Sequence, residues 1–283
     1  MIISVIVPVY NRFENFRSLF LCLLKQNKKF DELIIADDGS NENIINYITD
    51  LLPKVNFKIK HIYHEDKGFR KTRILNEAVK NSMGDLLIFC DQDLIFGEDY
   101  VERMSETKEK EFRMCRPCNT EEIEKNEIIK KLESGVQYKK CIENIPIEYE
   151  NSVNKALKKD RVRRILKSLK LKKRGIKLLG MSYSLWKKDY RNINGYDEKY
   201  IGWGYEDDDF GNRLTASGVR GIEVYTDQIL LHLWHQVSSS KKESLNEKYY
   251  RERKKKINKK NCHCEHGISN SLYSDKVIVR DIK

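Results

Sequence analysis

The chain lacks any uninterrupted hydrophobic run of about 18 residues, the length that a helix needs to cross a bilayer. Its first ten residues lack the positive charge of a signal peptide, and we interpret them as a first strand. The seven cysteines are odd in number and irregularly spaced, which favours reduced thiols over a disulfide framework. These absences predict a cytoplasmic protein without a membrane span.

An excess of acidic residues is also missing, since the formal net charge is +11 at pH 7. Two segments account for this charge. Residues 155–177 contain twelve Lys or Arg against the single acid Asp160, and residues 241–260 contain ten against three acids. The rest of the chain is mildly acidic, and its 40% hydrophobic content excludes a mainly disordered protein. The asymmetry predicts an anionic partner or surface.

Apolar periodicity in the first hundred residues predicts alternating strands and helices. Strands are expected at 2–9, 32–36, 57–63 and 86–90, with helices between them at 14–26, around 44–48 with Ser40 or Asn41 as the cap, and at 71–82. This alternation is typical of an α/β protein with a Rossmann-like, mostly parallel sheet covered by helices on both faces.

The alternation stops after residue 99. Weak helical patterns follow at 102–110 and 120–132, a last strand is expected at 223–231, and a charged helix at 247–257.

Two aspartates, Asp91 and Asp93, directly follow the predicted buried strand at 86–90. Side chains alternate along an extended chain, so both carboxylates can point the same way. Parallel sheets bind ligands at the carboxyl ends of their strands, where two acids repel each other unless a cation or a proton lies between them. Mg²⁺ or Mn²⁺ would suit such oxygen ligands and could share them with a phosphate. Two solvated acids at a strand end are the alternative.

Four consecutive acids, Glu206 to Asp209, open a predicted helix after Gly202-Trp203-Gly204-Tyr205. The helix dipole favours acids at this position, which allows a purely structural role. However, four adjacent carboxylates raise each other's pKa values, and the flanking glycines indicate close approach by a ligand. Downstream, His232 and His235 are candidate metal ligands. The Cys262–His266 segment could bind zinc, but its spacing matches no standard finger.

Within the first basic segment, Val162, Ile165, Leu166 and Leu169 recur at helical spacing while basic residues fill the other faces. Two interpretations stay open. The helix could pack on the domain with its charges in solvent, or it could lie on an anionic membrane surface. The segment is poor in aromatic residues, which disfavours nucleic acid as a partner.

Several of these motifs resemble one enzyme family. Val5–Arg12 and Ala36–Ser40 are similar to family 2 glycosyltransferases of the GT-A fold. Phe69–Asn76, Phe89–Leu94 and Ile193–Asp209 resemble β-1,4-galactosyltransferases and bacterial chondroitin-polymerase-type enzymes. The similarity covers about residues 2–99 and 178–236. It implies a GT-A domain at 1–240 (nucleotide-binding half 1–99, basic helical insertion 100–177, acceptor and catalytic half 178–240), followed by a basic tail at 241–283.

The resemblance also implies a reaction. An inverting enzyme would move a hexose or N-acetylhexosamine from a UDP-sugar to a hydroxyl of a glycan or lipid-linked saccharide, with Mn²⁺ or Mg²⁺, in bacterial surface polysaccharide synthesis. Asp207 matches the catalytic base and Asp93 and His235 match the metal ligands, with Asp91 and His232 as further candidates. Residues implied at the donor are Pro8, Tyr10, Arg12, Asp38, Phe69, Arg70, Arg73, Asp91 and Gln92; those at the acceptor are Gly180, Trp203, Gly204, Glu206 and Asp208.

This sequence departs from the galactosyltransferase pattern at two positions, since His232 stands where that family carries Met and Tyr205 replaces the second glycine of its G-W-G-G motif. The basic helix and tail could bring the enzyme to a lipid-linked acceptor, peripheral at the inner face of the cytoplasmic membrane. Two other functions stay open: a polyanion- or membrane-binding module with structural acids, and a nucleotidyltransferase. The first strand is not followed by a glycine-rich phosphate loop with a lysine, which disfavours the latter. The sequence does not name the sugar, although the absence of a bulky aromatic side chain at Leu178 favours room for an N-acetyl group.

Overall fold

The computed structural model describes residues 1–143, 147–169, 171, 176–224, 226, 228–236 and 245–283. Parts of both basic segments, at 170, 172–175 and 241–244, lie outside the described residues, as do the side chains of 147–150 and 152–153.

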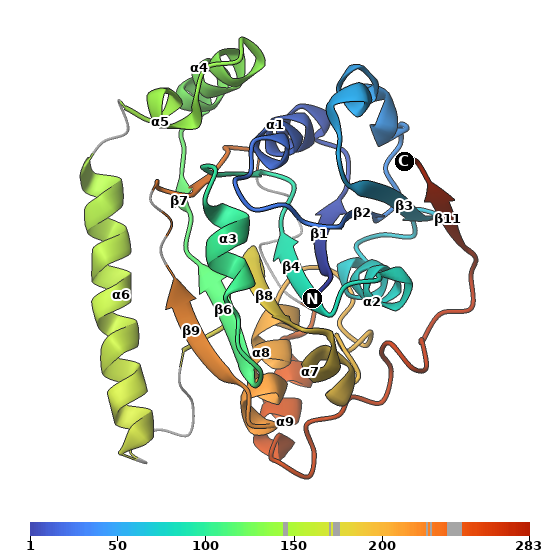
Figure 1. The fold of residues 1–283 in the computed structure, drawn as a ribbon. Coiled ribbons are helices and arrows are strands. Elements are labelled where there is room, and N and C mark those ends of the chain that lie inside the picture. Colours follow the sequence, from blue (N-terminus) through green and yellow to red (C-terminus); the bar gives the residue numbers. More distant parts are fainter. Residues whose placement is uncertain (144–146, 170, 172–175, 225, 227, 237–244) are drawn as a thin grey trace.

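An eight-stranded sheet forms the centre of the molecule (Figure 1). Four neighbouring strands of this sheet are parallel to one another. In this group β1 (Ile3–Val9) lies between β2 (Glu32–Asp37) and β4 (Leu86–Cys90), and β3 (Lys58–His64) pairs with β2. Beyond β4, the antiparallel β8 (Ser182–Trp186) leads to β6 (Glu111–Cys115) and then β9 (Arg220–Val224). At the opposite edge, β11 (Val277–Asp281) pairs antiparallel with β3. The prediction of a mostly parallel α/β sheet is confirmed.

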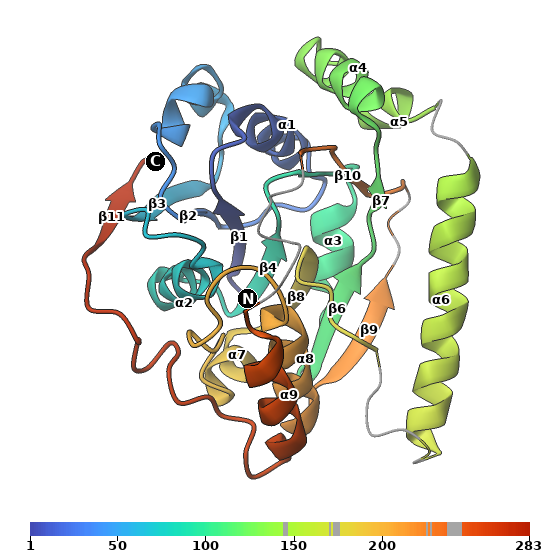
Figure 2. The same cartoon turned by 180° about the vertical axis from the view of Figure 1, so that it is seen from behind.

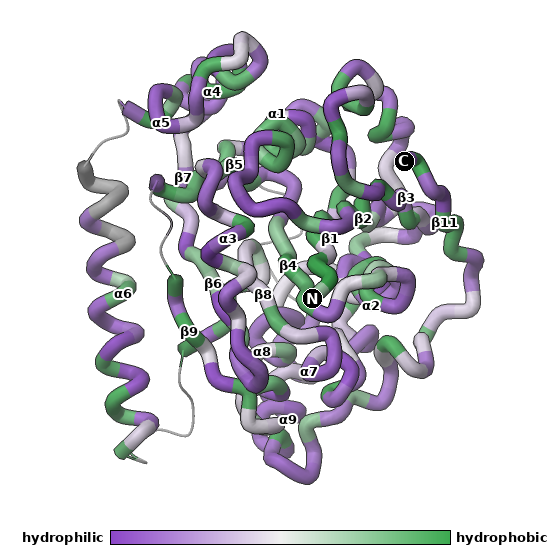
Figure 3. The backbone as a smooth tube through the Cα atoms, viewed as in Figure 1, coloured by the Kyte–Doolittle hydropathy of each residue, from purple (hydrophilic) through white to green (hydrophobic). Residues whose placement is uncertain are grey.

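Helices cover both faces of this sheet because strand residues alternate between two cores. Val5 and Val7 face the core that contains α1 (Phe13–Leu24) and α3 (Tyr100–Ser105), whereas Ile6 faces the core that contains α2 (Lys71–Asn81), α7 (Lys187–Asn192) and α8 (Glu206–Ala216). The apolar spacing of α1 buries Phe16 and Leu19 completely. Figure 3 shows the resulting pattern of apolar strands and polar outer helix faces.

A small second sheet brings distant parts of the chain together. Its order is β5 (Leu94–Ile95), β10 (Leu231–His232) and β7 (Cys118–Asn119). The backbone N–H of Leu233 donates to the carbonyl of Asp93 at 2.8 Å, and that of Thr120 donates to the carbonyl of His232 at 3.0 Å. The residue before β5 and the end of β10 are therefore held side by side.

The remaining helices lie outside the core layers. After β7 come α4 (Glu122–Glu133), α5 (Tyr138–Cys141) and the long α6 (Ile147–Ser168), which runs along the side of the molecule next to β7 and β9 in both views (Figures 1 and 2). Near the end of the chain, α9 (Glu247–Lys256) packs on α8. Among the described residues, we find no helix with the length and apolar character that a bilayer crossing requires.

Several sequence expectations differ from the structure. The helix expected near 44–48 is instead two 3₁₀ segments, η1 (Ile44–Tyr47) and η2 (Thr49–Lys54), because Asn43 caps the first turn and Pro53 interrupts the second. The strand expected at 223–231 is split into β9 and β10, and β6 was missed because charged residues interrupt its apolar pattern. In the predicted tail, the helix is confirmed, but β11 was not foreseen.

Candidate active site

Three side chains form a group that could hold a metal ion: Asp93, His232 and His235. Their ligand atoms all lie within 4.8 Å of one another, with each His Nε2 3.3 Å from a different Asp93 oxygen. The group is assembled because Asp93 immediately precedes β5 and His232 belongs to β10, its partner strand. One carboxylate and two imidazoles are a donor set that suits a divalent transition metal such as Mn²⁺.

The charges around Asp93 keep this ligand ionised. Burial by itself would raise its pKa, but contact with His232, the charges of both histidines and Arg12 hold the pKa at about 2. The Arg12 guanidinium lies 3.0 Å from Asp93 Oδ2. Burial lowers the pKa of His235, which favours the neutral imidazole that binds metals. The residues present therefore fit a divalent cation.

Asp91 does not join this group, although we expected both aspartates to point the same way. The strand ends at Cys90, and a turn in which Leu94 N–H donates to the Asp91 carbonyl breaks the extended geometry. Asp91 Oδ1 instead accepts a hydrogen bond from Lys71 Nζ at 2.7 Å. Burial is the main reason that the pKa of Asp91 is raised, with the Asp93 charge adding to it.

Lys71 is a site residue that the sequence analysis missed. Burial would lower its pKa, yet Asp91, Asp207 and Glu206 together raise it above the usual value. Its ammonium thus contacts the aspartate that follows β4 and lies near enough to the acids that open α8 to interact with their charges. A signal was present, because Lys71 lies inside the Phe69–Asn76 motif, but the same motif offers Arg70 and Arg73 as alternative cations.

Those arginines face another part of the chain. Arg70 Nη1 lies 3.2 Å and Arg73 Nη1 2.5 Å from the carboxylate of Asp275, and both guanidinium groups lie near the ring of Tyr273. Both are buried, at 3% and 2% exposure, so this acid from the region before β11 neutralises them. Direct contact of Arg70 or Arg73 with a nucleotide stays a prediction.

The remaining residues implied at the donor lie around the ends of β1 and β2. The Gln92 side-chain amide both donates to and accepts from the Tyr10 backbone at 3.1 Å, and Pro8 pairs in register with Ala36. Asp38 is buried, which raises its pKa, and it accepts hydrogen bonds from His64 Nε2 at 2.6 Å and from the Arg70 backbone at 3.0 Å.

Three aromatic side chains in this region stay unusually exposed: Tyr10 at 44%, Phe69 at 38% and Trp203 at 41%. A hydrogen bond of 3.2 Å from Gly202 N–H to the Phe69 carbonyl joins the loop before α2 to the loop before α8. Exposed rings on joined loops can stack on a base or a sugar.

The four acids of α8 have different surroundings. Asp209 is buried in an ion pair with Arg213 at 2.6 Å, which is a structural role. Asp208 accepts a hydrogen bond from Tyr250 of α9 and has Lys177 at 3.7 Å. Glu206 is 5% exposed, and burial with the adjacent Asp207 charge raises its pKa to about 7. Its Oε2 is buried without a hydrogen-bond partner among the residues described.

Asp207 lies over Gly180. Its Oδ1 accepts a hydrogen bond of 2.8 Å from the buried Tyr196 hydroxyl, and a Cβ added at Gly180 would lie 2.1 Å from the carboxylate. A side chain at position 180 would therefore displace this carboxylate. The helix that begins at Glu206 follows Tyr205, whose φ of 70° is left-handed and whose ring stacks on Tyr250 at 4.6 Å. Tyr205 can thus replace a glycine because α9 supports it.

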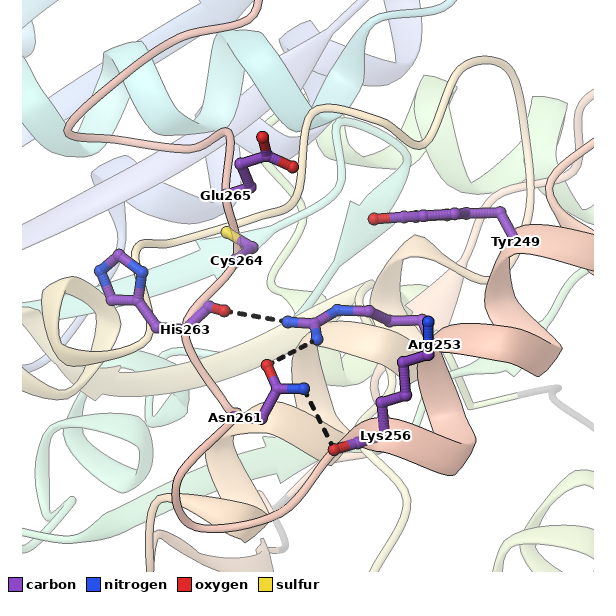
Figure 4. A pocket seen from close by; sticks show the side chains of 7 residues that line it. All are labelled: Tyr249, Arg253, Lys256, Asn261, His263, Cys264 and Glu265. Carbon is purple, nitrogen blue, oxygen red and sulfur yellow. Dashed lines mark hydrogen bonds between the residues drawn. The ribbon is translucent and has the colours of Figure 1, made fainter.

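The Cys262–His266 segment is not arranged as a metal site in the described part of the chain. The Cys264 thiol is buried against backbone carbonyls such as that of Asn194 at 3.4 Å, and burial raises its pKa to about 12. A cavity of about 340 Å³ lies beside it (Figure 4), lined by Tyr249, Arg253, Lys256, Asn261, His263, Cys264 and Glu265.

Comparisons with known proteins identify the family and the fold. Residues 4–149 match the model of glycosyl transferase family 2, and residues 160–236 match a model described as the N-terminal domain of galactosyltransferase. Validoxylamine A glucosyltransferase of Streptomyces hygroscopicus subsp. jinggangensis is 23% identical over 77% of this chain and 52% of its own. Chondroitin synthase of Escherichia coli is 24% identical over 76% of this chain and 32% of its own. The chain therefore spans about half or less of these relatives.

Two solved structures show the same fold at low identity. The mannosyltransferase PcManGT from Pyrobaculum calidifontis, in complex with GDP-Man and Mn²⁺, aligns with a TM-score of 0.54 at 14% identity, over 81% of this chain and 56% of its own. Staphylococcus aureus TarS 1–349 in complex with UDP-GlcNAc aligns with a TM-score of 0.52 at 14% identity, over 89% and 64%. Because the family 2 match alone covers just over half of the chain, the protein belongs to glycosyltransferase family 2 and has the GT-A fold.

Proposed function

We propose that this protein is an inverting, metal-dependent glycosyltransferase that moves a hexose or N-acetylhexosamine from a UDP-sugar to a hydroxyl of a glycan or lipid-linked saccharide, in bacterial surface polysaccharide synthesis. The observation that carries the proposal is the Asp93–His232–His235 group, together with Lys71, which contacts Asp91 and interacts electrostatically with Glu206 and Asp207 of α8. The UDP-GlcNAc complex of TarS and the chondroitin synthase relatives support the donor class and the pathway.

At the donor end, the residues would bind the diphosphate of the nucleotide. Asp93, His232 and His235 would hold a divalent cation, which when bound neutralises negative charge on the departing diphosphate. Arg12 adds a positive charge beside Asp93, and Lys71 adds another beside Asp91. Asp91 can serve the ribose or the transferred sugar because it is held away from the metal group.

The base of the nucleotide would lie near the ends of β1 and β2. Tyr10 and Phe69 offer exposed rings on which the base could stack. Asp38 and the backbone of Tyr10, which Gln92 holds by hydrogen bonds, would provide polar groups beside it. Pro8 would shape the wall of this site, and Arg70 with Arg73 would support it from behind through Asp275.

At the acceptor end, Asp207 would act as the general base. It removes the proton of the acceptor hydroxyl while the oxygen bonds to the anomeric carbon and the bond from that carbon to the UDP oxygen breaks. Attack on the face opposite the diphosphate inverts the centre. Tyr196 orients Asp207 through its 2.8 Å hydrogen bond. Glu206, with a pKa of about 7 and a buried oxygen without a partner among the described residues, can donate to or accept from a sugar hydroxyl.

The surroundings of Asp207 would shape the acceptor pocket. Gly180 leaves room beneath the carboxylate, Trp203 offers a half-exposed sugar platform, and Gly204 lets the loop approach a ligand. Asp208, which accepts a hydrogen bond from Tyr250, would lie on the α9 side of this pocket. Family membership favours this reaction over the nucleotidyltransferase and over the binding module without catalysis.

The decisive experiment separates donor binding from transfer. A set of UDP-sugars is screened with Mn²⁺ by calorimetry for binding and by UDP release for turnover, with Asp93→Asn, Asp207→Asn and, as a control on an exposed acid far from the site, Asp50→Asn. We expect Asp93→Asn to lose Mn²⁺-dependent donor binding. Asp207→Asn should keep donor binding but lose turnover by about 10³-fold or more. Full turnover by Asp207→Asn would refute the base assignment, and donor binding that ignores Mn²⁺ would refute the metal site.

A further inference from the structure

The outer face of α6 combines exposed aliphatic and basic side chains. Val162 is 54%, Ile165 53% and Leu169 63% exposed. These three residues recur at i, i+3 and i+7, so they form one stripe along the helix. A surface helix of a globular protein normally turns such a stripe toward the core. Here the stripe faces away from the protein.

The opposite face shows why α6 docks in this orientation. Asp160 is 3% exposed and lies on the side that faces the sheet. Its carboxylate accepts hydrogen bonds from Arg116 at 2.9 Å and from Arg163 at 2.9 Å, and Arg116 also reaches Glu223 of β9 at 3.0 Å. Ion pairs therefore help to hold the helix to the domain, while each side chain of the aliphatic stripe stays more than half exposed.

Positive charge borders the stripe. Lys158 lies one turn before Val162 in the same row, and Arg161 and Arg164 flank the row; all three are exposed. In both views α6 stands at the side of the molecule, so its outer face is accessible along its length (Figures 1 and 2). Residues 154–169 contain no aromatic side chain, which disfavours stacking on nucleic-acid bases.

We propose that this α6 outer face (Lys158, Arg161, Val162, Arg164, Ile165 and Leu169) binds an anionic lipid bilayer. The aliphatic side chains enter the headgroup boundary while the cations pair with lipid phosphates. A soluble polyanion would satisfy the cations alone and leave the stripe in water. This surface lies on α6 and does not depend on the proposed reaction, so each can fail without the other.

The test is flotation with vesicles of phosphatidylcholine containing about 30% phosphatidylglycerol, or of phosphatidylcholine alone, at about 0.15 M salt. One variant carries Val162→Ser, Ile165→Ser and Leu169→Ser; a second carries Lys158→Gln, Arg161→Gln and Arg164→Gln. The matched controls change exposed residues elsewhere: Ile123→Ser with Leu272→Ser, and Lys28→Gln with Lys29→Gln and Lys108→Gln.

We expect binding to anionic vesicles only, weakened about tenfold or more by either α6 variant and unchanged in both controls. The thermal unfolding midpoint without vesicles should be unchanged within a few degrees in all four proteins, which confirms that they fold independently of any activity. Equal flotation of the serine variant and the unchanged protein would overturn the proposal. Tight binding to a single-stranded oligonucleotide that only the glutamine variant loses would also overturn it, in favour of a soluble polyanion.

A second measurement reports on the stripe itself. All seven cysteines are buried, so Ile165→Cys adds an accessible thiol for an environment-sensitive fluorophore. Anionic vesicles should shift its emission to the blue, and the same label at Ile123→Cys should not respond. An unchanged emission at position 165 would show that the stripe stays in water and would refute insertion.

Discussion

At the residue scale, the position of each acid in the site is set by the residues next to it in space. Asp207 occupies the space above Gly180, and Tyr196 fixes its orientation. Lys71 pairs with Asp91 outside the metal group, while Asp93 lies with the two histidines. The chemistry of each acid thus follows from its neighbour, since Asp91, Asp93 and Asp207 have the same side chain.

The first prediction at this scale concerns Gly180→Ala. The added Cβ would lie 2.1 Å from the Asp207 carboxylate, so the acid must rotate away from its Tyr196 hydrogen bond. Gly180 is not in the left-handed region, so the backbone itself tolerates alanine. We expect turnover to fall about 10²-fold with donor affinity nearly unchanged, measured as UDP release and by calorimetry.

Gly135→Ala is the control, because a Cβ at that glycine meets nothing within 4 Å. Its positive φ of 80° should cost about 1 kcal/mol of stability without loss of turnover. Normal turnover in Gly180→Ala would show that Asp207 is not held as described.

The sequence allowed part of this residue-scale picture to be predicted. Asp93, His232 and His235 were all candidates, and the structure brings them together. Lys71 could not be ranked above Arg70 and Arg73, because spacing does not reveal which cation reaches the acids and which pairs with a distant Asp275. The turn after Cys90 that separates Asp91 from Asp93 also left no clear signal.

At the element scale, the segment before β11 acts as a support for α2. Asp275 pairs with Arg70 at the start of α2 and with Arg73 one turn later, and Tyr273 covers both guanidinium groups. Burial by itself would raise the pKa of Asp275, but hydrogen bonds from the two arginines hold it at about 2. Its stabilising contribution is present above about pH 4, the unfolded pKa, and is lost as the pH falls toward 2.

The second prediction follows for Asp275→Asn. Two buried guanidinium groups would lose their counter-charge, so we expect the free energy of unfolding to fall by about 2–4 kcal/mol at neutral pH. Urea denaturation measures this change. Asp281→Asn, an exposed acid at the end of β11, serves as the control and should stay within about 0.5 kcal/mol. Equal stability of both variants would mean that Asp275 is not the partner of these arginines.

Element prediction from sequence succeeded where periodicity was strong and failed where tertiary contacts decide. The α/β alternation up to residue 90 follows from apolar spacing, and its strands and main helices were placed to within a few residues. By contrast, the sequences of β6 and β11 mix charged and apolar residues and give no clear strand signal. They form strands because β6 can pair with β8 and β11 can pair with β3.

At the scale of the whole molecule, the metal group joins chain segments that are far apart in sequence. Asp93 precedes β5, while His232 and His235 belong to β10 and the residues after it. A ligand that binds the folded state and not the unfolded chain stabilises the fold by mass action.

The third prediction is therefore thermal. Mn²⁺ at about 100 times its dissociation constant should add about 2.7 kcal/mol to the stability, and EDTA should reverse the change. Asp93→Asn and His235→Ala should abolish the shift, and His263→Ala, an exposed histidine outside the group, should keep it. Differential scanning calorimetry measures the midpoint. An identical shift in Asp93→Asn would place the ion elsewhere.

The hydrogen bond from Thr120 to the carbonyl of His232 has a practical consequence for chimeric enzymes. Residues 121–177, which contain α4, α5 and α6, leave the sheet just after this threonine, whose side chain also accepts from the N–H of Trp234 at 2.9 Å. A graft that exchanges this excursion for that of another family member should place its junction after Thr120. A junction before Thr120 would replace the hydroxyl that accepts from the Trp234 N–H and would weaken the attachment of the segment that carries His232.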